Sequence, residues 1–339
     1  NLTTGNSILD PSKSNIFTYN ENIQAFYVSG NKKLSDKLEL QLGLRAENTQ
    51  TTGFSKTLNE TTKNNYFKLF PTVFLSYTIN EDKLLSFNYS KRIDRPSYSD
   101  LNPFRFYTTS FNFSEGNPFL NPSFSENFEL SYTYKNAYSS LYVNYLENGF
   151  DQVTYVEPNS IIQKVKPNNF FNQVNFGFFQ SYSFKIKDYW ENNSDISVFY
   201  YKTNSDIPNI VPSISTWSGS FNTQNSFILD KNKKYKAELS FMYQLPSLAG
   251  SYELSSYYQL NIGFKANYFS NKLQISVNAI DILKSNKQIF TQFVNNIKQE
   301  NLDYADIRRL RISLVYNFGK KLNIDKRDNS NIDEKNRIK

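Results

Sequence analysis

The sequence predicts an all-β protein, one large antiparallel sheet that closes into a transmembrane β-barrel. Two observations predict the sheet: a strict two-residue alternation of apolar and polar side chains, and about a dozen repeats of that alternation along the chain without helical segments. Residues 38–47 read L-E-L-Q-L-G-L-R-A-E, so the leucines fall on one face of a strand and the charged residues on the other. The same alternation returns at 309–318.

Alternating windows and the turn signals between them indicate about thirteen strands. Several exceed ten residues, whereas soluble sandwiches usually have strands of about five or six, and a tilted strand crosses a bilayer in about nine to eleven. The predicted spans are 17–30, 37–52, 64–79, 83–95, 123–135, 138–157, 161–187, 194–204, 214–229, 235–245, 252–268, 273–284 and 304–319.

The connections between these strands are predicted to alternate in length. Short turns rich in Asn, Asp and Lys lie at 80–83, 136–137, 230–234 and 270–272. Longer segments lie at 53–63, 96–122, 205–213 and 285–303. Counting back from the last strand places every short turn on one side, and the brief 158–160 link is the poorest fit to this parity. Short turns on one side and long loops on the other are typical of bacterial outer-membrane barrels.

Composition excludes several classes of chemistry. The 339 residues contain no Cys and no His, which removes disulfides, thiol chemistry, Ser-His and Cys-His catalysis and the usual zinc sites. Tyr and Phe number 25 and 30, more than a soluble core of this length needs, and both suit strands and membrane boundaries. The mean hydropathy of −0.59 looks soluble, but a barrel in lipid needs only alternate residues to be apolar. We therefore predict no catalytic residues, metal or cofactor.

Charge and chain ends add further expectations. The net charge of +7 comes from scattered residues, so nucleic-acid binding is not favoured. The chain opens on a polar stretch without Met or a signal peptide, which indicates the C-terminal piece of a longer protein. Residues 1–319 are predicted to form part of the barrel, and the polar, aperiodic residues 320–339 a disordered tail.

The orientation of the apolar face decides the class of protein. In lipid every backbone polar group must be satisfied by a neighbouring strand, so only a closed barrel is viable. The opposite face carries Arg45, Glu47, Arg309 and Arg311, and a charge at the bilayer midplane costs about 2–4 kcal/mol. These residues are therefore predicted to face a hydrated lumen. A soluble propeller or solenoid is the alternative, but the chain lacks the repeat of about forty residues that a propeller shows.

One connection carries a dense set of Pro and Gly motifs. It reads R-P-S-Y at 95–98, L-N-P-F at 101–104 and G-N-P-F-L-N-P at 116–122. Pro removes ladder donors and Gly permits unusual backbone angles, so a rigid loop outside the sheet is favoured over direct ligand contact. The signature residues of this loop are Arg95, Pro96, Tyr98, Leu101, Asn102, Pro103, Gly116, Asn117, Pro118 and Pro122.

This stretch resembles the signature of the Bacteroidetes outer-membrane β-barrel family related to TonB-dependent receptors. The segment 19–27, with Glu21 and Ala25 inside it, resembles the family strand Y-x-E-x-x-x-A-x-Y, and 311–319 resembles its closing strand ending in Y-N-F-G. The resemblance covers the chain to Gly319. It implies an outer-membrane transporter whose barrel has about twenty-two strands around a plug. The plug, the TonB-contacting box and about nine strands would then lie upstream.

Candidate ligand contacts are few. Glu39 and Glu47 lie on one strand face about 25 Å apart, too far for a glycosidase pair. Arg309 and Arg311 would attract anionic substrates or pair with a plug carboxylate. The aromatic stretch 104–113 could stack on a ligand, although packing against neighbouring loops explains it equally well. Its candidate contacts are Phe104, Arg105, Phe106, Tyr107, Phe111 and Phe113.

The resulting functional prediction is a receptor in the cell outer membrane that imports a scarce or bulky substrate of the siderophore, oligosaccharide or peptide class. Its partners would be outer-membrane lipid, that extracellular ligand and TonB through an upstream region. One alternative is a TonB-independent barrel acting as a structural or adhesive surface protein or a passive pore. Another is a soluble secreted β-protein that binds carbohydrate, which would partition into water without detergent.

Overall fold

The structure, a computed structural model, describes residues 14–56, 59–156, 160–208, 210–250, 252–294 and 297–318. About three-quarters of these residues lie in β-strands, as the alternation predicts. The one helix in the described ranges is the four-residue α1 (Tyr98–Leu101). No helix in them has the length or the hydropathy needed to cross a membrane. The predicted tail, 320–339, and the boundary at Gly319 lie outside the described residues.

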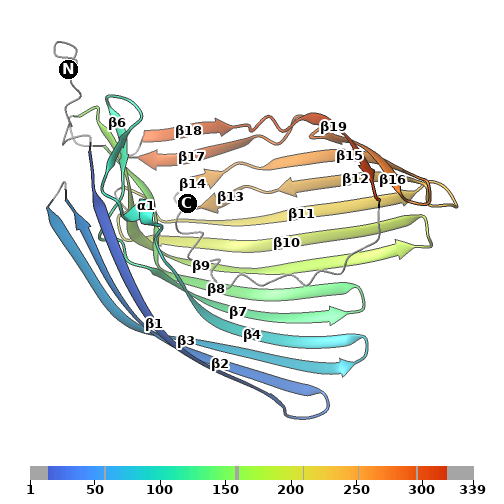
Figure 1. Cartoon of the computed structure of the whole chain (residues 1–339), viewed down its shortest axis with the longest axis horizontal. Helices are drawn as coiled ribbons and strands as arrows, with labels where there is room; N and C mark the ends of the chain where they lie inside the picture. Colours follow the sequence, from blue (N-terminus) through green and yellow to red (C-terminus); the bar gives the residue numbers. More distant parts are fainter. Residues whose placement is uncertain are drawn as a thin grey trace.

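Thirteen strands form one continuous antiparallel path in chain order, which confirms all thirteen predicted strands (Figure 1). Their bounds are β1 (Phe17–Lys33), β2 (Leu38–Ser55), β3 (Glu60–Asn80), β4 (Lys83–Asp94), β7 (Ser123–Tyr134), β8 (Ala137–Val156), β9 (Gln163–Ile186), β10 (Trp190–Ser205), β11 (Ile214–Ile228), β12 (Tyr235–Gln244), β15 (Tyr257–Tyr268), β16 (Leu273–Ile280) and β19 (Arg309–Tyr316). Three predicted bounds are wrong. β15 begins only at Tyr257, because residues 252–254 belong to a second sheet. The predicted strand 273–284 ends at Ile280, and the predicted strand 304–319 begins only at Arg309.

The alternation of short and long connections is confirmed, with two corrections. Residues 53–55 and 60–63 belong to β2 and β3, so most of the predicted 53–63 loop is a hairpin that prolongs these strands. The predicted loop 285–303 contains the strands β17 (Gln288–Val294) and β18 (Ile297–Asp303). At the short turns, Lys135, Lys187 and Lys233 adopt positive φ angles of 49–56°. Six short turns, which follow β1, β3, β7, β9, β11 and β15, define the turn end of the sheet. The long connections define its loop end.

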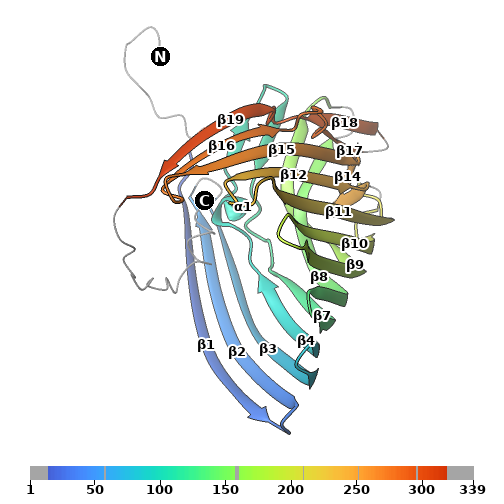
Figure 2. The same cartoon turned by 90° about the vertical axis from the view of Figure 1, so that its right-hand side faces the viewer.

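The sheet curls into an open trough, which Figure 2 shows from its end. Among the described residues β1 and β19 each pair along one edge only, so the predicted closed barrel is present as a partial one. The segment between β4 and β7 folds into the concave side of this trough, where α1 lies in both views (Figures 1 and 2). The convex side of the trough is therefore the outer face of the barrel wall.

The convex face is apolar and uncovered. Leu141 is 57% exposed, Ile196 45%, Ile262 45% and Phe264 42%, although each is an apolar residue in the middle of a strand. Monomeric soluble proteins rarely expose an apolar surface that extends over many neighbouring strands. The apolar face of these strands is therefore not packed inside the core of a soluble sandwich, and it has the character of a lipid-facing surface.

Buried apolar side chains gather at the loop end instead. Val153, Phe170, Phe171 and Val211 form a small core there, with the rings of Phe170 and Phe171 4.9 Å apart. A second sheet of four short strands, which the alternation did not predict, adds to the loop end. It contains β13 (Ser247–Ala249), β14 (Tyr252–Leu254), β17 and β18.

Candidate functional site on the concave face

The signature segment, residues 95–122, begins with a tightly capped turn of helix. Ser97 is the N-cap of α1: its hydroxyl accepts a hydrogen bond from the Asp100 amide at 3.2 Å, and its own backbone amide donates to the Asp100 carboxylate at 3.3 Å. This capping box satisfies amides that the start of a helix otherwise leaves unpaired. Leu101, at the end of the helix, is buried. The turn directs the chain into the trough immediately after β4.

The second half of the segment returns against the first half. The Gly116 amide donates to the Asn102 carbonyl at 2.9 Å, and the Asn117 amide donates to the Asp100 carbonyl at 2.5 Å. A Cβ on Gly116 would lie only 2.3 Å from the Asn102 carbonyl oxygen, so glycine is required for this close approach. Between the two halves runs a small hairpin, β5 (Arg105–Tyr107) and β6 (Asn112–Glu115), and β6 also pairs with β9 in parallel.

Side-chain amides fasten the segment to the barrel wall. Asn117 donates to the Pro167 carbonyl of β9 at 3.0 Å, and Asn148 of β8 donates to the Pro122 carbonyl at 2.9 Å. The signature residues Pro96, Gly116, Pro118 and Pro122 are buried, whereas Tyr98, Asn102 and Pro103 are half-buried. Most signature side chains are thus used in shaping the segment, which favours the structural role predicted for them.

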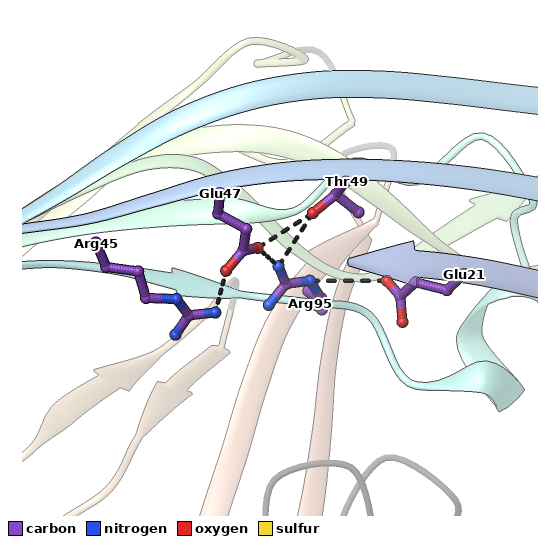
Figure 3. Close-up of polar contacts among 5 residues, drawn as sticks. All are labelled: Glu21, Arg45, Glu47, Thr49 and Arg95. Atoms are coloured by element: carbon purple, nitrogen blue, oxygen red, sulfur yellow. Dashed lines mark hydrogen bonds and ion pairs between the residues drawn. The ribbon is translucent and has the colours of Figure 1, made fainter. Parts of the chain in front are cut away.

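A buried cluster of charges joins the start of the segment to β1 and β2 (Figure 3). The Glu47 side chain is fully buried and is bonded by the guanidinium groups of both Arg45 and Arg95. The Glu47 carboxylate also accepts a hydrogen bond from Thr49 at 3.1 Å, and Arg95 Nε lies 3.7 Å from a carboxylate oxygen of Glu21. Because a buried charge must be paired, these contacts hold the segment against the wall.

Arg45 and Glu47 were predicted to face the lumen and Arg95 to belong to the signature loop, but the contact between the three side chains was not predicted. Arg95 and Glu47 are 48 positions apart in the chain, and only the fold brings them together. Glu21 lies in the segment 19–27 that resembles a family strand, but no role was predicted for it. Thr49 was not predicted to be part of the cluster. The only signal available was the position of Glu21 and Glu47 on the polar faces of neighbouring strands.

The aromatic candidates lie on the β5–β6 hairpin and beside it. The Arg105 guanidinium lies 4.8 Å from the centre of the Phe113 ring, and Arg105 Nε donates to Glu115 at 3.0 Å. This bond to Glu115 raises the pKa of Arg105 above its ordinary value. Tyr107 packs against Phe113 with ring centres 5.3 Å apart. The side chains of Phe104, Phe106 and Phe111 are exposed.

A cavity of about 500 Å³ opens between the signature segment and the first strands. Its aromatic lining consists of Phe104, Tyr107 and the exposed Phe119. Its polar lining consists of Arg105, the half-buried carboxylate of Glu115, Asn15, Glu60 and Lys166. Lys164 and Lys166 approach Glu115 within 3.9 and 4.0 Å. Aromatic faces beside charged groups can bind a planar or sugar-like ligand. Phe119, Lys164 and Lys166 were not predicted.

Arg309 and Arg311 lie elsewhere on the concave face. Both line a second cavity, of about 730 Å³, with Asn278, Glu238 and Lys265. Arg311 lies opposite Asn278 across the β16–β19 pair, so the two arginines share the polar side of the sheet. They do not join the Glu47 cluster. Among the described residues, no group of three acidic side chains is placed to hold a metal.

The strand path and its two unlike faces define the wall of an outer-membrane β-barrel. The chain belongs to the outer membrane protein beta-barrel family, whose model matches residues 1–316. The cell outer membrane is accordingly its location. No curated protein matches the chain in sequence.

Solved structures of uptake proteins share the fold. The ferric-catecholate import receptor Fiu from E. coli K12 is similar with a TM-score of 0.60 at 12% identity, over 88% of this chain and 44% of that protein. The ferric yersiniabactin uptake receptor FyuA from Yersinia pestis gives 0.57 at 12%, over 85% and 45%. The FrpB iron transporter from Neisseria meningitidis gives 0.56 at 10%, over 78% and 41%. The chain thus spans less than half the length of these three proteins.

Proposed function

We propose that this chain is the C-terminal part of the barrel of an outer-membrane uptake receptor. Its substrate would be too scarce or too bulky for open diffusion, of the siderophore, oligosaccharide or peptide class. The strongest support is residues 95–122, which fold into the trough and are fastened there by buried charges and backbone hydrogen bonds. A segment folded into the lumen narrows it, which suits selective uptake better than open diffusion. The similarity to import receptors favours the same function.

The free edges of the sheet support a larger barrel. Along its outer edge, β1 presents backbone groups that no described strand pairs, and so does β19. Such groups cost several kcal/mol each in hydrocarbon, so further strands are needed to close the wall. We propose that the full protein supplies them, together with a plug in the lumen and a TonB-contacting segment.

The loop-end cavity is the proposed site of first contact with substrate. Phe104, Tyr107 and Phe119 offer ring faces, while Arg105 and Lys166 offer cations beside them. Binding and passage suit this lining of ring faces and adjoining cations.

Uptake by the full-length protein tests the proposal. Cells that lack the gene are grown with a ferric siderophore, an oligosaccharide or a peptide as the limiting nutrient, with and without the gene restored. A growth defect on one class, reversed by the gene, is the expected result. The purified protein in a planar bilayer should pass little current, because the proposed plug fills the lumen. A large steady conductance together with normal growth on all three classes would identify a passive pore and overturn the proposal.

A further inference from the structure

We propose that the neighbouring turns at residues 229–234 and 269–272 form a binding site for the phosphate headgroup of an anionic phospholipid. The β11–β12 turn and the β15–β16 turn lie together at the turn end of the sheet (Figure 1). The Asn267 amide donates to the Lys234 carbonyl at 2.8 Å and so joins β15 to the first turn. This inference does not depend on which substrate the protein imports.

The first turn is a built structure with an excess of positive charge. Asp230 is its only carboxylate, and its two oxygens accept hydrogen bonds from the Tyr235 amide at 2.8 Å and the Asn232 amide at 3.2 Å. Lys233, in the left-handed conformation, lies 3.8 Å from Asp188. In the described part of the chain no carboxylate comes within ion-pair distance of Lys231, Lys234 or Lys272. Among the described residues these three ammonium groups therefore make no ion pair, although Asp230 acts on Lys234 at longer range.

Lys234 stands against the rings of two tyrosines of the lipid-facing surface. Its Nζ lies 5.0 Å from the centre of the Tyr235 ring and 4.2 Å from that of Tyr268. Tyr235 stacks on Phe264 of the convex face, and Tyr268 lies on the same face because it follows Phe264 by four residues. These contacts with the rings hold the ammonium group at the margin of the apolar band that faces the turn end.

Exposed apolar side chains complete the surface and identify its occupant. Leu229 is 56% exposed and Phe269 70% exposed, one in each turn. Apolar groups that enter acyl chains beside lysines that meet phosphates are characteristic of membrane-interface segments. A soluble acidic partner would match the lysines but not the adjoining lipid-facing rings. The lipid is therefore the better match.

The same device recurs at another turn. Lys83 and Lys135 lie 5.4 and 5.5 Å from the ring of Tyr134, which is also exposed on the convex face. Lys135 is, however, 4.0 Å from Asp82, so its charge is partly compensated. We therefore assign the stronger site to the β11–β12 and β15–β16 turns.

Lipid retention by the full-length protein in zwitterionic detergent tests this assignment. The probes are phosphatidylglycerol and phosphatidylcholine of the same chain length, read by native mass spectrometry and by the thermal unfolding midpoint. The wild type should retain phosphatidylglycerol preferentially and gain stability from it. The triple variant Lys231→Gln, Lys234→Gln, Lys272→Gln should lose the preference, by roughly fivefold for each lysine removed.

Matched variants distinguish lipid binding at these two turns from a general effect of positive charge on the protein. Substituting three loop-end lysines, Lys56→Gln, Lys63→Gln and Lys298→Gln, should leave the preference intact, and arginine at the three turn positions should preserve it. If the triple glutamine variant does not assemble, the single Lys234→Gln variant should still show its fivefold loss. Equal retention of both lipids by the wild type, or loss in the loop-end variant as well, would overturn the proposal. An equal midpoint shift with inorganic phosphate alone would reassign the site to a free anion.

Discussion

The loop end and the turn end of the same strands are stabilised by different interactions: a buried protein core at the loop end, and ladder hydrogen bonds and lipid at the turn end. At the loop end Phe170 and Val153 are almost completely buried, Glu47 is buried where the long connection after β4 begins, and a second small sheet adjoins the wall. At the turn end the wall is a single layer, and apolar residues such as Leu130 and Phe264 stay more than one-third exposed. The loop end is therefore organised like a small soluble domain, whereas the turn half depends on the ladder hydrogen bonds and on lipid.

This difference explains how the same apolar residue types can form a protein core at one end of the strands and a lipid-facing surface elsewhere. Phe and Leu at the loop end exclude water from a protein core, and the same residue types at mid-strand are solvated by hydrocarbon. The buried charge of Glu47 is tolerated because two guanidinium groups, one of them from the long connection after β4, pair with it. Substitutions at the two ends should therefore have different consequences.

The largest effect is expected at the buried carboxylate. Glu47→Ala leaves the guanidinium groups of Arg45 and Arg95 without their common partner, which should destabilise the protein by about 3–5 kcal/mol. Urea unfolding in lipid vesicles measures this loss. Glu39→Ala is the control, because Glu39 lies on the same strand face but is exposed. Equal effects of the two substitutions would show that the cluster does not hold the segment.

A substitution in the loop-end core should have a larger effect on stability than one on the lipid-facing surface. Phe170→Ala empties part of a closed protein core and should cost about 3–5 kcal/mol. Leu141→Ala, on the lipid face, should cost much less, because acyl chains fill the space that the side chain leaves. The same unfolding experiment compares them. A larger loss for Leu141→Ala would contradict the assignment of that face to lipid.

Charge placed on either face of the last strand tests the orientation directly. Ile312→Arg puts a guanidinium on the apolar face and should impair assembly, at a cost of about 2–4 kcal/mol near the midplane. Ser313→Arg, on the opposite face of β19, should assemble normally. Heat-modifiable migration on gels reports assembly, and equal tolerance of the two arginines would argue against a lipid-facing surface.

The smallest effect is expected inside the signature segment. Gly116→Ala introduces a methyl group against the Asn102 carbonyl and should cost about 1–3 kcal/mol by overpacking. Gly30→Ala is the control, since no atom lies within 4 Å of its added Cβ. Limited trypsin digestion should show faster cleavage at Arg105 in the Gly116 variant alone. Unchanged cleavage would mean that the segment can yield at this contact.

Features of the fold that depend on neighbouring residues could be predicted from the sequence, whereas contacts between distant residues could not. The thirteen wall strands were predicted because each alternates apolar and polar residues over its membrane-crossing part. The strand residues 53–55, G-F-S, and strand β18, I-K-Q-E-N-L-D, were missed because they lie beyond the apolar band and need no alternation. Arg95 and Glu47 were each singled out, yet their contact could not be predicted, because pairing between distant strands is set by register.

The sequence by itself determined the strands, their apolar and polar faces, the parity of turns and loops, and the membership of residues 95–122 in a recognisable signature. Side-chain alternation and turn chemistry are properties of neighbouring residues, so one chain suffices to see them. Only the tertiary structure decided that the signature segment folds into the trough, that Glu47 is buried between Arg45 and Arg95, and that Lys234 stands against Tyr268. Those contacts join residues far apart in the chain or in neighbouring strands, and they arise from the curvature and register of the whole sheet.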